Sequence, residues 1–117
     1  MNTTKRIKVG GRTYDLKYPN VGNFIDIKVL ETKLSQGSAM SLVNGTGEQL
    51  DAYFYITTYA HFQVLCPDLL KDLKVNSLLE LSLLDFQELL NVYLEEIQPW
   101  ISEIQKAVKE KMAVDGK

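Results

Sequence analysis

Two side chains in this 117-residue sequence have the intrinsic reactivity for acid–base or nucleophilic chemistry, His61 and Cys66. A histidine titrates near neutral pH and can act as a general acid or base, and a thiolate is a good nucleophile. The helical neighbours of His61 are tyrosine, threonine and leucine, so no Ser or Cys nucleophile is paired with this base. We therefore expect a structural histidine and an unreactive, buried cysteine, and we predict that the chain is not an enzyme.

Acidic side chains accumulate in the C-terminal half, with no basic residue between Glu80 and Ile104. Paired carboxylates can act as acid and base or bind hard cations. These acids are instead spread along helix faces, without the dense oxygen-ligand loop of a calcium site. We expect a solvated acidic surface. The alternative is an electrostatic contact with a basic partner, such as the N-terminal segment of a neighbouring copy. The acids are Glu80, Asp85, Glu88, Glu95, Glu96 and Glu103.

The remaining motifs for cofactor chemistry are missing from the sequence. One cysteine and one histidine provide neither a disulfide framework nor a multi-cysteine zinc site. The glycines do not form a GxGxxG or GxxxxGK[ST] phosphate-binding string. We predict no metal and no cofactor.

Composition indicates one globular domain over residues 1–117. Hydrophobic content is 45% and charged content 24%, which are ordinary values for a folded domain. Charged residues or glutamine interrupt every apolar stretch before it reaches the roughly 18 to 20 residues of a membrane span. The first residues lack the apolar run and cleavage site of a secretory signal, so we expect a cytoplasmic protein.

Positive charge is concentrated at the N-terminus. Residues 1–17 hold five basic side chains and one acid, whereas the rest of the chain holds eight basic and fourteen acidic ones. Lys5, Arg6, Lys8 and Arg12 are therefore candidate contacts for an acidic partner or for phosphates. With few aromatic residues nearby for base stacking and a net charge of −2, nucleic acid is the less favoured partner.

Glycines 10 and 11 predict a β-hairpin over residues 5–18. Pairing about this turn places Val9 opposite Arg12 and Lys5 opposite Leu16, and it brings the charges of Arg6 and Asp15 together. The apolar side chains then share one face, which must pack on a helix or join another sheet. These side chains are Ile7, Val9, Tyr14 and Leu16.

The rest of the sequence predicts about four to five helices, so the fold class is a mainly helical α+β domain. Apolar spacing predicts helices over residues 21–34 and 50–65, a short one over 67–73, and a long one after residue 85. We expect side-chain caps from Thr46 with Gln49, from Ser77 with Glu80, and from Asp85 with Glu88. We also expect a mobile segment over residues 35–47 and a kink or break at Pro99. The helical body should cover residues 20–113. The apolar pattern is lost from Lys109, and we expect a frayed tail over 114–117.

Aromatic side chains are the second group of candidate contacts. Tyr55, Tyr59 and Phe62 form one arc of the central helix, and Trp100 lies on the last one. Such residues often anchor protein interfaces, but they equally serve as core packing. So much apolar surface in a small domain must be partly exposed or covered by association, and we expect a homo-oligomer.

The string Ile7-Lys8-Val9-Gly10-Gly11-Arg12-Thr13-Tyr14-Asp15-Leu16, a following helix and a late Tyr93-x-x-x-Ile97-x-Pro99-Trp100-Ile101 element resemble the small tail assembly chaperones of long-tailed bacteriophages. The resemblance covers most of the chain in the order of its elements. It implies an N-terminal strand pair, a helical body and a tendency to oligomerise. It also implies that the protein coats the long, helical tape measure protein in the host cytoplasm while tail tube subunits assemble.

Two other functions remain open. A structural virion component, such as a connector or completion protein, would use the same surfaces in a closed ring that stays in the particle. A small regulatory module would bind nucleic acid through the basic hairpin, with an affinity that collapses as salt is added.

Overall fold

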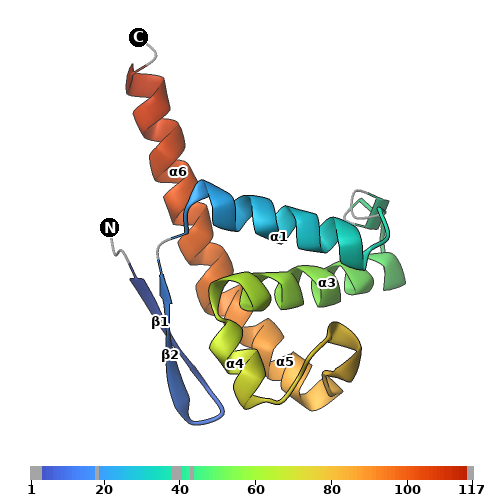
Figure 1. Ribbon diagram of the computed structural model, residues 1–117. Coiled ribbons are helices and arrows are strands. Elements are labelled where there is room, and N and C mark those ends of the chain that lie inside the picture. Colours follow the sequence, from blue (N-terminus) through green and yellow to red (C-terminus); the bar gives the residue numbers. More distant parts are fainter. Residues whose placement is uncertain (1–3, 18, 38–40, 43, 116–117) are drawn as a thin grey trace.

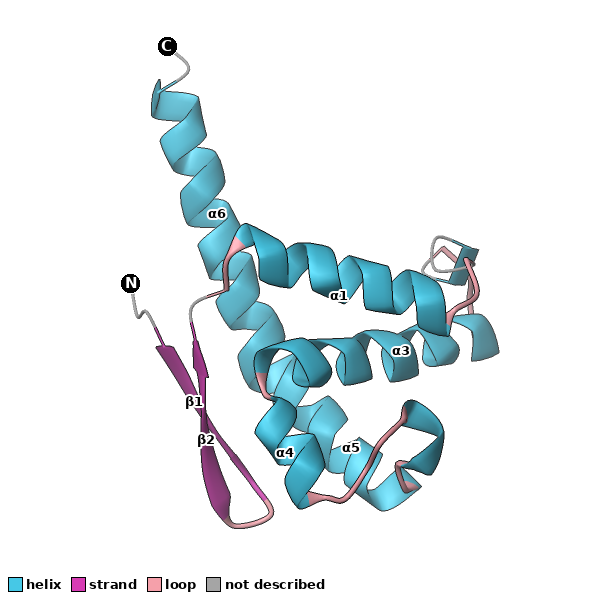
Figure 2. Cartoon of the chain, viewed as in Figure 1, coloured by secondary structure: helices cyan, strands magenta, loops and turns pink. Residues whose placement is uncertain are grey.

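The computed structural model describes residues 4–17, 19–37, 41–42 and 44–115. It confirms the predicted fold class: an N-terminal antiparallel hairpin is followed by a mainly helical body (Figures 1 and 2). The hairpin lies against one side of the helices, and the last helix extends past it to the C-terminus (Figure 1). Part of the 35–47 segment, for which mobility was predicted, lies outside the described residues.

The hairpin consists of β1 (Thr4–Val9) and β2 (Arg12–Lys17), and the predicted register is confirmed at every pair from Val9↔Arg12 to Lys5↔Leu16. Gly10 and Gly11 both have positive φ, +59° and +80°, as the tight turn requires. The apolar face packs on the helices, and β1 contacts α5 (Leu83–Val92). Ile7 and Leu16 are almost completely buried there.

Helix α1 (Val21–Leu34) has the predicted bounds and packs on α3 (Glu48–Leu65). Asn20 caps α1: its side chain accepts from the backbone N–H of Asn23, whose side chain accepts from the N–H of Asn20. The predicted cap of α3 by Thr46 and Gln49 is wrong. Gly47 occupies the N-cap position at a φ of +57°, and the helix starts without a side-chain hydrogen bond.

Short elements connect α3 to the last helices. Pro67 opens α4 (Pro67–Asp72), and a 3₁₀ turn, η1 (Leu78–Glu80), precedes α5. The predicted side-chain cap from Ser77 is wrong, since its backbone carbonyl, not its hydroxyl, accepts from Glu80. Asp85 and Glu88 do not cap α5 either. Ser82 does so, because the helix begins three residues earlier than predicted and the Ser82 hydroxyl accepts from the Asp85 N–H at 3.1 Å.

The helix continues from α5 through a π-helical segment, η2 (Tyr93–Ile97), into α6 (Gln98–Asp115). The irregularity predicted at Pro99 therefore lies in the turn before the proline, where the N–H of Gln98 donates to the carbonyl of Tyr93. Widening this turn accommodates the missing donor and the ring of Pro99 without a break. The backbone stays helical beyond Lys109, where the apolar pattern is lost, and up to Asp115, because Ala, Lys, Glu and Met favour helix. Of the frayed tail predicted over 114–117, the first two residues are therefore helical, and residues 116–117 lie outside the described part.

The core lies where the hairpin, α3, α4, α5 and the start of α6 meet. It contains residues from every one of these elements, far apart in the sequence. Its largest completely buried side chain is Phe62 of α3. The helical members include Tyr59, Phe62, Leu69, Leu70, Leu89, Tyr93, Ile97, Trp100, Ile101 and Ile104.

Candidate protein-binding site

Three highly exposed leucines lie close together in the sequence, in η1 and at the start of α5. Leu79 is 95% exposed, Leu83 74% and Leu84 85%. Leu79 and Leu83 border a groove of about 390 Å³ between the end of α1, the first half of α3, η1 and the start of α5. We call this feature the leucine groove; its lining residues are Leu34, Ala52, Tyr55, Ile56, Leu78, Leu79, Leu81, Leu83 and Phe86.

Local backbone geometry explains why these leucines are not buried. Ser77 and Ser82 are both extended, so η1 is a single turn held between two stretches that cannot continue a helix. Leu78 and Leu81 turn partly inward against the core, while Leu79 points to solvent. The floor of the groove is formed by Tyr55 and Phe86, whose ring centroids are 4.5 Å apart.

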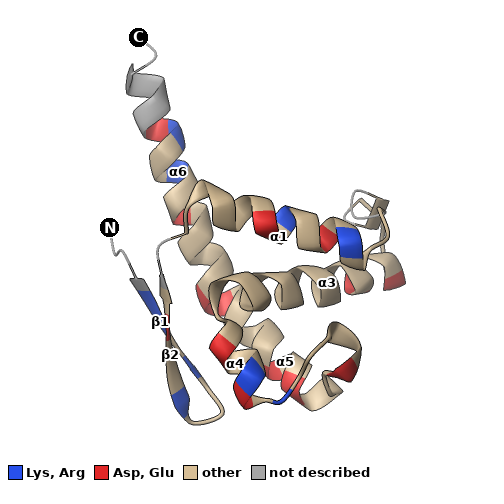
Figure 3. Ribbon diagram, in the orientation of Figure 1, with Lys and Arg blue, Asp and Glu red and all other residues tan. Residues whose placement is uncertain are grey.

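Acidic residues lie close in sequence to the residues that line the leucine groove. Glu48 and Asp51 lie in the first turn of α3, and Glu80 and Asp85 lie in η1 and the first turn of α5 (Figure 3). Lys33 at the end of α1 is the nearest basic residue in sequence to a lining residue. These neighbouring acids favour a partner segment with basic residues beside an apolar face.

The structure places the basic hairpin residues away from the leucine groove, and acids of the same chain neutralise three of them. Arg6 pairs with Asp15 across the hairpin at 2.9 Å, which raises the pKa of the Arg6 guanidinium. Arg12 pairs with Asp72 at 3.2 Å, and Lys5 lies 3.9 Å from Glu96. Lys8 is exposed and makes no ion pair within the described part of the chain.

Two hydrogen bonds complete this internal match between hairpin and helices. The Tyr14 hydroxyl donates to Asp72 at 2.6 Å, and the backbone N–H of Gly10 donates to Glu88 at 2.7 Å. The bond from Tyr14, followed by the charge and bond of Arg12, lowers the pKa of Asp72. For Glu88 and Glu96, a contact with a neighbouring copy was one alternative. In the structure they bind the hairpin of their own chain.

Of the four aromatic candidates, Tyr55 alone is available at the surface of this chain. It is 38% exposed and lines the leucine groove. Tyr59, Phe62 and Trp100 are core residues with 4%, 0% and 6% exposure. These three side chains belong to the core cluster of the described chain, so they serve as packing here, and their role as partner contacts stays a prediction.

His61 and Cys66 are both buried side chains. The Nδ1–H of His61 donates to the Thr57 carbonyl at 2.7 Å, and burial lowers the pKa of His61. Burial raises the pKa of the Cys66 thiol, which disfavours the reactive thiolate. The Thr57 hydroxyl donates to the buried carboxylate of Glu31 at 3.1 Å, so this polar cluster is satisfied within the core.

Two further questions about the described residues concern a metal site and a membrane-spanning helix. Among residues 4–17, 19–37, 41–42 and 44–115, no group of three or more His, Cys, Asp or Glu side chains is arranged to hold a metal ion. In the same part of the chain, every helix is too short or too polar to span a bilayer.

Sequence analysis missed the leucine groove as a site. The leucine-rich residues 78–84 carry no sequence motif that assigns them a role. The available signal was the density of leucine between Ser77 and Asp85 without helical spacing, which leaves some leucines with no common face to bury.

Comparisons with known proteins add no family to this description. No protein-family model, no curated protein and no solved structure matches the chain.

Proposed function

We propose that this chain is a non-catalytic assembly protein that binds an apolar helical segment of a protein partner in the leucine groove. In the terms of the resemblance described above, it is a tail assembly chaperone that coats a phage tape measure protein. The observation that carries the proposal is the exposure of Leu79 and Leu83, which line an open apolar groove.

The energetic argument is that exposed apolar surface is stabilised when a partner covers it. Burying a leucine side chain contributes roughly 1.5 to 3 kcal/mol relative to leaving it in water. Singly scattered apolar residues need no partner, but a contiguous set over a groove is typical of an interaction site. An amphipathic helix lying in an apolar groove is a common way to use such a surface.

Size supports coating by many copies. The described chain extends 49 Å along its longest axis. At 1.5 Å per residue, one copy spans at most about 30 residues of a helical partner. A protein that keeps a much longer helix soluble must therefore bind repeatedly along it, which agrees with the expected oligomerisation.

The test is an affinity pull-down of the tagged chain from cells that express its native gene cluster. We expect the wild-type chain to recover one long, helix-rich protein with many copies bound, measured by mass spectrometry and light scattering. The double variant Leu79→Asp/Leu83→Asp should lose at least tenfold of this recovery, because it places charge in the groove. The matched control, Ile25→Asp/Val29→Asp, changes exposed apolar residues of α1 and should keep it.

Two results would contradict the proposal. Equal recovery with the groove variant would show that the leucines do not carry binding. Recovery of closed rings or finished particles, with the chain retained in them, would assign it to the structural components of a virion instead.

A further inference from the structure

We propose that the outer edge of β2 and the cleft beside it bind an extended, basic peptide segment of a partner protein by strand addition. This is a second binding site, separate from the leucine groove, and it does not depend on the helical partner proposed above.

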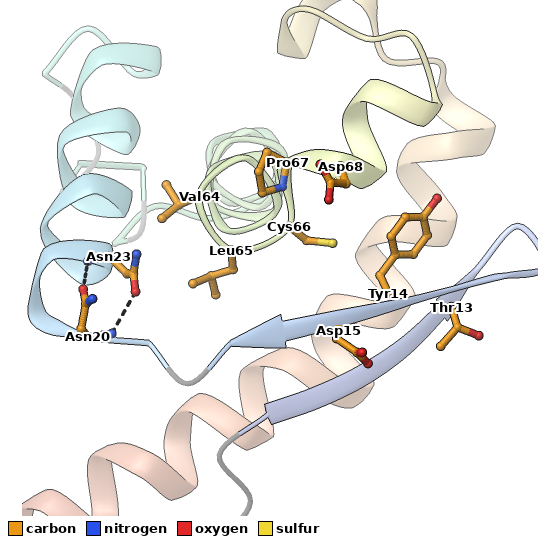
Figure 4. A pocket seen from close by; sticks show the side chains of 10 residues that line it. All are labelled: Thr13, Tyr14, Asp15, Asn20, Asn23, Val64, Leu65, Cys66, Pro67 and Asp68. Carbon is orange, nitrogen blue, oxygen red and sulfur yellow. Dashed lines mark hydrogen bonds between the residues drawn. The ribbon is translucent and has the colours of Figure 1, made fainter.

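The cleft lies between the hairpin and the junction of α3 with α4 and has a volume of about 640 Å³. Thr13 and Asp15 of β2 lie on one side, and Leu65 and Cys66 lie on the other (Figure 4). The capped start of α1, at Asn20 and Asn23, closes one end.

Hairpin geometry directs unpaired backbone groups into this cleft. A two-residue turn is closed by a hydrogen-bonded pair, here Val9 and Arg12, and hydrogen-bonded and non-hydrogen-bonded pairs then alternate. Thr13 and Asp15 belong to the non-hydrogen-bonded pairs, so their N–H and C=O groups point outward from β2. Among the described residues, no hydrogen bond outside the hairpin ladder engages these backbone groups.

The two edges of the hairpin differ in their protection. Edge strands are commonly guarded by charged side chains, especially lysine. On β1 the edge carries Lys5, Arg6 and Lys8. β2 carries Arg12 and Lys17 at its two ends, whereas its residues that line the cleft, Thr13, Tyr14 and Asp15, include one acid and no lysine or arginine. The stretch of β2 that opens onto the cleft is therefore without the lysine protection that β1 has.

Charge and side-chain alternation define the occupant. The residues that line the cleft include no lysine or arginine and two carboxylates: Asp15, which is paired with Arg6, and Asp68, which makes no ion pair among the described residues. A strand added to β2 would direct every second side chain toward Leu65 and Cys66 and the others toward solvent. The fitting segment is thus extended, apolar at alternate positions and basic between them.

The experiment uses the full chain, labelled with ¹⁵N, and a capped synthetic peptide of sequence Thr-Lys-Arg-Ile-Lys-Val as the probe. This peptide has the required alternation of basic and apolar residues. We expect it to shift the amide signals of Thr13 and Asp15 and to slow their hydrogen exchange, with binding that weakens as salt is added. The same peptide with N-methylated backbone nitrogens should fail to bind, because it cannot form the strand hydrogen bonds.

Proline substitutions provide a matched pair on the two edges. Thr13→Pro removes an outward N–H and leaves the β1–β2 ladder intact, so it should weaken peptide binding about fivefold, the scale of one hydrogen bond. Lys8→Pro makes the same change on the β1 edge and should leave binding within twofold. Leu79→Asp/Leu83→Asp should also leave it unchanged, which separates this site from the leucine groove.

Any of three outcomes would overturn the proposal. They are unchanged exchange of the Thr13 and Asp15 amides at saturating peptide, equal binding by the N-methylated peptide, and protection of the β1 edge instead of β2. The first two are measured on the wild-type chain, so the proposal stays testable if a proline variant does not fold.

Discussion

The hairpin side and the leucine side of the molecule differ in the burial of their apolar side chains. Where β1 and β2 dock, Ile7 and Leu16 are buried at 1% and 0% exposure, and polar groups such as Tyr14 and Gly10 have specific acceptors. Where η1 joins α5, Leu79 is exposed and the groove beside it is open.

Helix α5 contacts both sides, which makes the difference informative. Its start lines the leucine groove through Leu83 and Phe86, while its later residues, Glu88 and Leu89, contact the hairpin and the core. The hairpin face that docks on the helices has its apolar side chains buried and its polar groups paired within one chain. The leucine side has apolar surface that a partner would cover.

The largest expected difference in stability is between alanine variants of two leucines, one on each side of the molecule. Leu89→Ala should lower the free energy of unfolding by about 3 kcal/mol, because Leu89 is completely buried and truncation leaves a cavity. Leu79→Ala should change it by less than about 0.5 kcal/mol. Urea unfolding followed by circular dichroism measures both. Similar losses for the two variants would mean that Leu79 packs in solution.

A smaller contrast concerns helix caps on the leucine side. Ser82→Ala should cost about 1 kcal/mol of stability, since the hydroxyl satisfies the backbone N–H of Asp85 at the start of α5. Thr46→Ala should cost much less, because α3 begins without a side-chain hydrogen bond at its cap. The same denaturation experiment decides this, and the opposite ranking would restore the cap predicted from the sequence.

The smallest effect is a pH response confined to the hairpin side. The folded-state pKa of Asp72 lies below its ordinary value of 3.8, so its carboxylate stabilises the hairpin contact above that pH. This contribution is lost as the pH falls through the folded-state pKa. An NMR titration should therefore show the Tyr14 and Arg12 signals moving at pH below 3.8. Asp72→Asn should remove that transition, and an identical titration in the variant would contradict the assignment.

The sequence predicts some features of this fold better than others. The hairpin register and the bounds of α1 were predicted correctly, because turn glycines and apolar spacing act between neighbours in the chain. The caps at Thr46 and Asp85 were wrong, since the N-caps are Gly47 and Ser82, and a shift of one to three residues changes which side chain reaches the free N–H groups. Pro99 was correctly recognised as a source of irregularity, but the distortion lies one turn earlier.

The candidate site was harder to predict from the sequence than the fold. Basic and aromatic residues were chosen as contacts for their chemical type. Arg12 and Trp100 illustrate why type is insufficient: the first is paired with Asp72 and the second is buried. The exposed leucines were not chosen, because leucine is an ordinary core residue and its exposure depends on which elements cover it.

The sequence by itself determined the local elements of this protein: a two-glycine hairpin with its facing pairs, the helices with apolar periodicity, and the uneven distribution of charge. Tertiary structure alone decided which members of these patterns are buried, paired or left open. Tyr14 donates a hydrogen bond to Asp72, 58 positions away in the sequence, and Gly10 donates one to Glu88, 78 positions away. The physical reason is that burial and charge pairing depend on contacts between distant segments, whereas turns and periodicity depend on residues a few positions apart.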